Sequence, residues 1–97
     1  MRGKLTIATV VYGGKGAALD KFFWAVNRYG WTHKVLVVLA SDHGVKNPEK
    51  LRDKYKSLDI QYCYTQVEPT FDKLILVAEN EVDTNKSIYL DLEKPAL

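Results

Sequence analysis

Residues 34–40 read KVLVVLA, and positions 35–39 of this run are apolar without interruption. A strand with one face in water alternates apolar and polar residues, so this pattern is typical of a strand buried on both faces, as in a parallel sheet covered by helices. Residues 5–12, LTIATVVY, form a similar run that is rich in β-branched residues and is followed by Gly13 and Gly14. The two runs predict two buried strands, the first closed by a glycine turn.

Helical and extended patterns alternate along the rest of the chain. Apolar residues at three- and four-residue spacing predict helices over residues 17–29, from Pro48 onward, and over residues 71–82. Extended patterns predict further strands over residues 59–67 and 87–92. Strands that alternate with helices imply right-handed crossovers and a mainly parallel sheet. We therefore expect one α/β domain over residues 1–97, a three-layer α/β/α, Rossmann-like arrangement around a four-stranded sheet.

Composition narrows the classes of function. The 97 residues include 46% hydrophobic and 27% charged residues, as in a globular domain, and a net charge of +2. This charge is too small and too scattered for the basic stripe that nucleic-acid binding needs, so we expect no nucleic-acid partner. The apolar runs are far shorter than the roughly 20 residues that span a bilayer, so we expect no membrane partner. The single cysteine, Cys63, fits a reducing compartment, and we expect a cytoplasmic protein.

Aromatic residues gather around the first predicted helix. Phe22, Phe23, Trp24 and Trp31 fall on or beside its apolar face. Aromatic side chains at such positions belong to a core more often than to a stacking platform. We therefore expect these four to be buried.

A candidate site follows from the predicted sheet, because ligands of open parallel sheets bind beyond the carboxyl ends of the strands, where the strand order reverses. The glycines of residues 13–16 can let backbone amides approach a phosphate at a helix start, and Lys15 adds a positive charge there. A tight turn that simply needs glycine is the alternative. The segments expected at this edge are residues 9–16, residues 41–43, Glu68, Asp91 and Glu93.

Two acidic residues end the last predicted strand. Asp91 and Glu93 are two positions apart in an extended segment, so they project to the same side and can share one divalent cation through oxygen ligands. The alternative is that Asp91 is simply solvated where the strand ends. Lys73 lies in the first turn of the third predicted helix, where the helix dipole disfavours a cation. A nearby anion would explain it, and a solvated lysine is the alternative.

These elements, in this order, resemble the N-terminal nucleotide-binding half of a GT-A-fold glycosyltransferase, most of all the glycogenin-like family 8 retaining enzymes. Members of that family have a first strand with Thr, then Tyr and a Lys-Gly-Ala helix start, matched here by Thr9, Tyr12 and residues 15–17. The second strand, residues 36–41, is similar to the family's Leu-Val-Val-Leu-Ala-Thr run.

Two further motifs carry the same resemblance. Residues 70–74 match the family's Thr-x-x-Lys-Leu helix start, and residues 91–93 match its Asp-x-Asp motif, with Glu93 in place of the second aspartate. The resemblance implies that Asp91 and Glu93 hold a Mn²⁺ or Mg²⁺ ion that bridges the diphosphate of a UDP-sugar. It also implies that Thr9 and Tyr12 contact the nucleoside. The donor-binding candidates are Thr9, Tyr12, Lys15 and Lys73, and no catalytic residue is assigned.

The function that we expect is a glycosyltransferase-like domain, minimal or degenerate, that binds a UDP-sugar through a divalent metal and is related to enzymes of hexosyl transfer. Complete members of the family continue past the position of Leu97 with the acceptor site and a further metal-binding histidine. The alternative is a non-catalytic nucleotide-binding or protein-interaction module, acting as a homodimer through the edge of the strand at residues 87–92. A flavodoxin-like or other Rossmann-type small binder, suggested by the turn at residues 12–14, also stays open.

Overall fold

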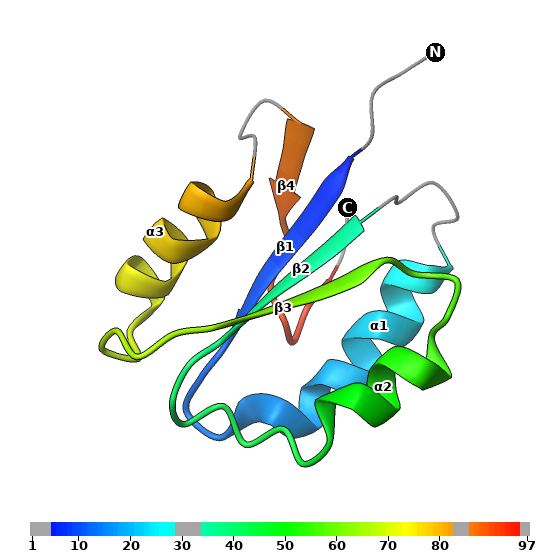
Figure 1. Cartoon of the computed structure of the whole chain (residues 1–97), viewed down its shortest axis with the longest axis horizontal. Helices are drawn as coiled ribbons and strands as arrows, with labels where there is room; N and C mark the ends of the chain where they lie inside the picture. Colours follow the sequence, from blue (N-terminus) through cyan, green and yellow to red (C-terminus); the bar gives the residue numbers. More distant parts are fainter. Residues whose placement is uncertain (1–4, 29–33, 83–85, 96–97) are drawn as a thin grey trace.

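The computed structural model describes residues 5–28, 34–82 and 86–95. It contains one four-stranded sheet in the order β3-β2-β1-β4, and every pair of neighbouring strands is parallel (Figure 1). The α/β fold with a four-stranded sheet is therefore confirmed. In chain order the elements are β1 (Thr6–Val11), the 3-10 helix η1 (Lys15–Ala18), α1 (Leu19–Asn27), β2 (Lys34–Leu39), α2 (Pro48–Lys54), β3 (Ile60–Tyr64), α3 (Phe71–Glu81) and β4 (Ser87–Tyr89). No helix in these three segments is both long and apolar enough to cross a membrane.

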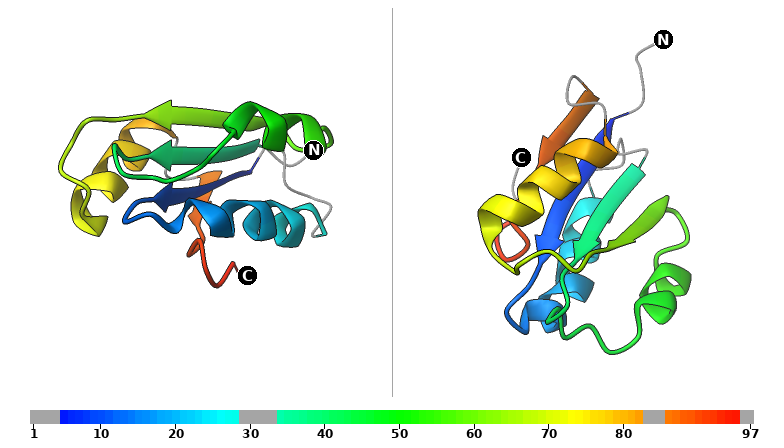
Figure 2. Two further views of the ribbon diagram at one scale, coloured as in Figure 1. Left: turned by 90° about the horizontal axis from the view of Figure 1, so that it is seen from below. Right: turned by 60° about the vertical axis from the view of Figure 1, so that its left-hand side comes forward.

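The central strand β1 contributes alternate residues to two separate hydrophobic clusters. Ile7 and Val11 pack in a cluster that contains the buried residues of α1. Ala8 and Val10 pack in a second cluster that contains Leu74 of α3. Successive side chains of a strand point to opposite faces of the sheet, so α1 and α3 cover opposite faces, and the two views of Figure 2 show them on either side of the strands.

The first helical segment differs from the single helix expected over residues 17–29. A 3-10 helix, η1, occupies Lys15–Ala18, and the α-helix proper spans Leu19–Asn27. Gly16, within η1, packs directly against the backbone of Val45 and thereby ties this turn to the loop after β2. Position 29 lies outside the described residues.

Trp24 corrects one expectation about the core. Phe22 and Phe23 are fully buried, as expected, but Trp24 is 54% exposed. Phe22, Phe23 and Val26 lie on the buried face of α1. Because a helix turns by about 100° per residue, Trp24 lies on the other side of α1 and points toward solvent. There the guanidinium of Arg28 lies 4.8 Å from the centre of the indole ring. The expectation for Trp31 concerns a position outside the described residues.

Helix α2 begins as the sequence predicts and is tied to α1. The Asn47 side chain accepts a hydrogen bond from the Lys50 N–H at 3.1 Å, and Pro48 is the first helical residue. At the other end of α2, the Tyr55 hydroxyl and the Lys54 ammonium both donate to the Asp20 carboxylate of α1. The hydrogen bond from Lys54, and then that from Tyr55, hold the pKa of Asp20 below its ordinary value.

The last two strands are shorter than predicted. β3 ends at Tyr64 rather than at position 67, although the Thr65 N–H still donates to the Leu39 carbonyl. β4 pairs with β1 from Ser87 to Tyr89 only, whereas the sequence predicted a strand to position 92. The Leu90 N–H donates to the Ala8 carbonyl at 3.0 Å, and the chain then leaves β1.

Candidate functional site

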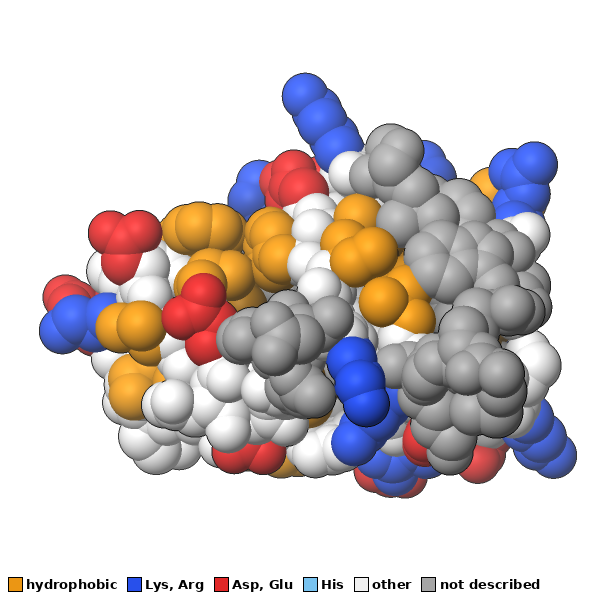
Figure 3. Space-filling view, turned by 90° about the horizontal axis from the view of Figure 1, so that it is seen from above, with side chains coloured by type: hydrophobic (Ala, Val, Ile, Leu, Met, Phe, Trp, Pro, Cys, Tyr) orange, Lys and Arg blue, Asp and Glu red, His pale blue; other side chains and the backbone are white. Residues whose placement is uncertain are grey.

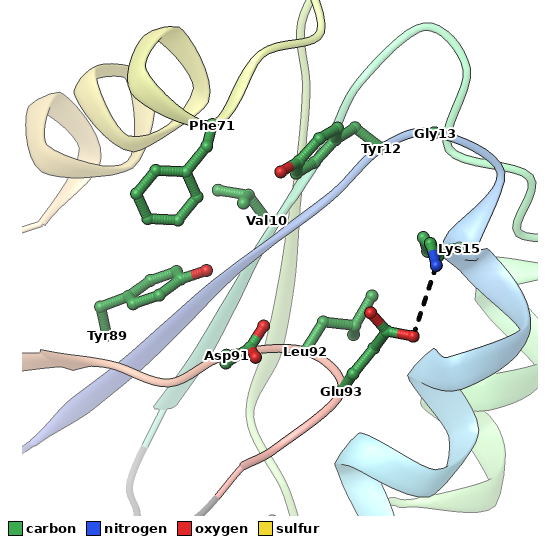
Figure 4. Close-up of a pocket in the computed structure, with 9 residues that line it drawn as sticks. All are labelled: Val10, Tyr12, Gly13, Lys15, Phe71, Tyr89, Asp91, Leu92 and Glu93. Carbon is green, nitrogen blue, oxygen red and sulfur yellow. Dashed lines mark ion pairs between the residues drawn. The ribbon is translucent and has the colours of Figure 1, made fainter.

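The order of the strands identifies one place in the sheet where a ligand would be expected. From β1 the chain moves outward to β2 and β3, and it then returns to the other side of β1 as β4. The strand order thus reverses between β1 and β4, and ligands of open parallel sheets bind at the carboxyl end of such a point. A cavity of about 140 Å³ lies there (Figure 4). Its lining residues are Val10, Tyr12, Gly13, Lys15, Phe71, Tyr89, Asp91, Leu92 and Glu93.

One end of this pocket is aromatic. Tyr12 follows β1, Phe71 is the first residue of α3, and Tyr89 is the last residue of β4. The rings of Phe71 and Tyr89 meet edge to face with their centroids 5.5 Å apart. Burial, and then the negative charge of Asp91, raise the pKa of Tyr89 to about 12, so its phenol is a neutral hydrogen-bond donor at pH 7.

The other end of the pocket is charged. The Lys15 ammonium of η1 and the Glu93 carboxylate form an ion pair at 3.6 Å, drawn as a dashed line in Figure 4, and Asp91 lies between this pair and the aromatic end. The side chains of Lys15 and Glu93 are 58% and 55% exposed. An exposed ion pair contributes little to stability, so both groups can change partners at small cost.

The segment after β4 is held by two buried leucines. Leu90 and Leu92 are each only 5% exposed and belong to the cluster on the α1 side of the sheet. Tyr89, Asp91 and Glu93 line the pocket, and so does Leu92. The two buried leucines therefore anchor the segment beside the pocket.

The glycine turn serves the fold more than the pocket. Gly13 and Gly14 have φ angles of 62° and 72°, in the left-handed region that favours glycine. The Gly14 N–H donates to the Asp42 carbonyl at 2.8 Å, and the Lys15 N–H donates to the Tyr12 carbonyl at 3.2 Å. These two amides are already bonded within the protein and are not available to a ligand.

Two of the donor-binding candidates lie away from the pocket. Thr9 is fully buried on the face of Ile7 and Val11, and its hydroxyl finds no hydrogen-bond partner among the described residues. The Lys73 ammonium pairs with the Glu68 carboxylate at 3.2 Å, which supplies the anion that its place in a helix first turn suggested. The structure therefore brings together Tyr12, Lys15, Asp91 and Glu93, while Thr9 and Lys73 do not line the cavity.

Phe71 and Tyr89 line the pocket although no motif singled them out. A signal for Tyr89 was present in the sequence, because it shares the two-residue spacing of Asp91 and Glu93. Phe71 carries no such signal. Its position depends on how α3 crosses the sheet, and this angle is a property of the packed structure.

The described side chains do not form a metal site by themselves. Within residues 5–28, 34–82 and 86–95, no three side chains of His, Cys, Asp or Glu form a group that could hold a metal. Asp91 and Glu93 nevertheless both line the cavity and supply hard oxygen ligands. Mg²⁺ is commonly bound by one or two carboxylates together with substrate phosphates. The pair therefore suits a cation that binds along with a diphosphate.

No protein-family model matches the chain. Searches of curated protein sequences and of solved structures find no match either.

Proposed function

We propose that this chain is a glycosyltransferase-like domain that binds a nucleotide-diphosphate sugar, with UDP as its nucleotide part, in the pocket between β1 and β4. The observation that carries the proposal is that Tyr12, Lys15, Asp91 and Glu93, which come from opposite ends of the sequence, line one cavity where the strand order reverses. A few well-placed polar groups beside an apolar wall occur in small-molecule sites, which enclose about 300–1,000 Å³. This cavity of about 140 Å³ would enclose only part of a nucleotide, and the rest would lie on the surface. Here an aromatic end and a charged end suit a ligand that has both a planar base and a diphosphate.

The charged end is arranged to take up the diphosphate. Lys15 and Glu93 are paired with each other at 3.6 Å. In this proposal the Lys15 ammonium would bind a phosphate oxygen, and Asp91 and Glu93 would hold Mn²⁺ or Mg²⁺. Such an ion, when bound, neutralises the negative charge that develops on a departing nucleotide diphosphate. Because the Lys15–Glu93 pair is exposed, this exchange of partners costs little.

The experiment that tests the proposal is isothermal titration of UDP into the protein, with Mn²⁺ and with EDTA. The variant Asp91→Asn removes the central carboxylate, and Asp42→Asn is the matched control, an exposed carboxylate in the loop after β2 that does not line the pocket. We expect micromolar binding that is lost with EDTA and in Asp91→Asn but kept in Asp42→Asn. Absence of UDP binding in every condition would overturn the proposal. Release of UDP from UDP-glucose then distinguishes an enzyme from a binding domain.

A second candidate, a protein-interaction module that acts as a homodimer, is favoured by the edge of the sheet. β4 is an edge strand that pairs with β1, and its residues Ile88 and Tyr89 are exposed. Figure 3 shows hydrophobic side chains gathered on one described surface of the molecule. An open strand edge is a template for pairing with another chain.

Light scattering over a range of protein concentrations tests this second candidate. Because the Leu90 N–H points to β1, the backbone groups of Ser87 and Tyr89 point away from it. Ser87→Pro removes one of these outward N–H groups without breaking the bonds to β1. A dimer that becomes a monomer in Ser87→Pro would support edge pairing. A wild-type monomer at all concentrations would contradict it.

A further inference from the structure

We infer that Phe71 and Tyr89 form the wall on which the planar base of the nucleotide stacks, so that the ligand lies with its base toward α3 and its phosphates toward η1. This inference rests on the proposed function. It goes further by giving the ligand a direction in the pocket and by assigning a role to two residues outside the motifs.

The first support is the exposure of the two rings. Phe71 is 43% exposed and Tyr89 is 37% exposed, although their rings contact each other edge to face at 5.5 Å. Exposed aromatic groups that border a cavity retain apolar area that a ligand can cover. Figure 4 shows both side chains beside Val10 and Tyr12 at the same end of the pocket.

The second support is the polarity of the pocket. The side chains at the aromatic end, Val10, Tyr12, Phe71 and Tyr89, carry no charge, whereas Lys15 and Glu93 lie at the other end with Asp91 between (Figure 4). A diphosphate placed against the aromatic end would lose hydration without gaining a charged partner. A planar base loses little there and gains a stacking contact. Only one direction of the nucleotide therefore satisfies both ends.

The third support is that Phe71 contributes little to the core. The buried residues of α3 are Leu74 and Ala78, which are 0% and 4% exposed and hold the helix on the sheet. Phe71 lies at the start of the helix, beside the cavity and outside both buried clusters. Its removal should therefore change ligand binding more than it changes the fold.

The test compares the affinities of two probes in the presence of Mn²⁺: UDP, which has a base, and inorganic pyrophosphate, which has none. We expect Phe71→Ala to weaken UDP binding about tenfold, the effect of losing one base–aromatic stack, and to leave pyrophosphate binding unchanged. Phe71→Trp keeps an aromatic face and should retain UDP affinity. Leu76→Ala is the matched control, since Leu76 is an apolar residue of the same helix, 59% exposed and outside the pocket.

A sugar ring is the other group that packs on aromatic faces, and uridine and glucose separate the two. Competition of uridine, but not of glucose, with UDP in the wild-type protein supports stacking of the base. Should Phe71→Ala fail to fold, Tyr89→Leu removes the second ring while keeping apolar volume, and the same loss of UDP affinity is expected.

The outcomes for the inference and for the proposed function are distinct. If wild-type protein binds UDP but Phe71→Ala binds it equally well, or loses UDP and pyrophosphate to the same extent, the stacking wall is wrong and the proposed function stands. If wild-type protein binds neither UDP nor pyrophosphate, both are wrong.

Discussion

The Lys15 ammonium and the Glu93 carboxylate lie 3.6 Å apart and connect η1 to the segment after β4 at the carboxyl end of the sheet. Exposed pairs of this kind contribute about 0 to 1 kcal/mol to stability. The importance of this pair lies in its position, since it sets a cation and an anion side by side at the charged end of the pocket. A diphosphate needs the positively charged side chain, and a metal ion bound to the diphosphate needs the carboxylate.

Replacement of Lys15 by Met should separate binding from stability. We expect the free energy of unfolding to change by less than about 1 kcal/mol, because the pair is exposed. UDP affinity should fall about tenfold, because a charge-assisted contact to phosphate is lost. Calorimetry and thermal unfolding measure the two effects. Lys21→Met, an exposed lysine of α1 outside the pocket, is the control, and an equal loss in that variant would show that only overall charge matters.

Thr9→Val should stabilise the protein. The Thr9 hydroxyl is fully buried without a partner among the described residues, and valine has the same shape without the polar group. We expect the free energy of unfolding to rise by about 1 kcal/mol in urea denaturation. UDP affinity should not change, because Thr9 and Tyr12 point to opposite faces of β1. A loss of UDP affinity in this variant would instead support the contact between Thr9 and the nucleoside that the family resemblance implies.

Gly16 and Gly13 should respond differently to alanine. A Cβ at Gly16 would collide with the backbone of Val45, whereas a Cβ at Gly13 meets nothing within 4 Å. Gly16→Ala is therefore expected to destabilise by about 1–3 kcal/mol through overpacking. Gly13→Ala places an alanine at a φ angle of 62°, and we expect this strain alone to lower the free energy of unfolding by about 1 kcal/mol. Urea denaturation of the two variants checks the order, and a larger loss for Gly13→Ala would contradict it.

The contact between Tyr55 and Asp20 should depend on pH. Tyr55→Phe removes the hydrogen bond to the Asp20 carboxylate, and we expect a loss of about 1 kcal/mol at pH 7. The pKa of Asp20 is lowered in the folded state, so this contribution is present above the unfolded pKa of about 3.9 and is lost as the pH falls through the folded value.

Thermal unfolding at pH 7 and at pH 3 measures this dependence. The gap between wild type and Tyr55→Phe should narrow at pH 3. Tyr62→Phe is the matched control, because the Tyr62 hydroxyl donates at 2.8 Å to the Pro48 carbonyl, which does not titrate. A gap for Tyr55→Phe that is the same at both pH values would exclude the proposed role of the carboxylate.

The fold was predictable because its signals are local. The uninterrupted apolar run at residues 35–39 predicted a strand buried on both faces, and these five residues are each at most 1% exposed. The sequence analysis expected Asp91 and Glu93 on one side of a strand. Both line the pocket, but β4 ends at Tyr89, so the segment after the strand places them there and the period of a strand does not.

Other placements depend on relationships that the sequence analysis did not draw from a strand or helix period. Thr9 lies in β1 and Tyr12 directly follows this strand, three positions later, and the odd spacing places their side chains on opposite faces of the sheet. Lys73 pairs with Glu68 in the loop before its helix, and the sequence does not determine whether it turns to that loop or to the pocket. The position of Trp24 depends on which stripe of the helix faces the sheet.

β4 pairs with β1 over only a short length, so the affinity for a ligand depends on the equilibrium between docked and undocked β4. β4 shares three residue pairs with β1, whereas β2 shares six, yet Tyr89, Asp91 and Glu93 are all positioned by β4 and the segment after it. Local openings of such a strand need less free energy than global unfolding. A ligand that touches β4 favours its docked state, and any undocked fraction lowers the apparent affinity in proportion. Hydrogen exchange at the Leu90 amide, which bonds to Ala8, would report this linkage directly.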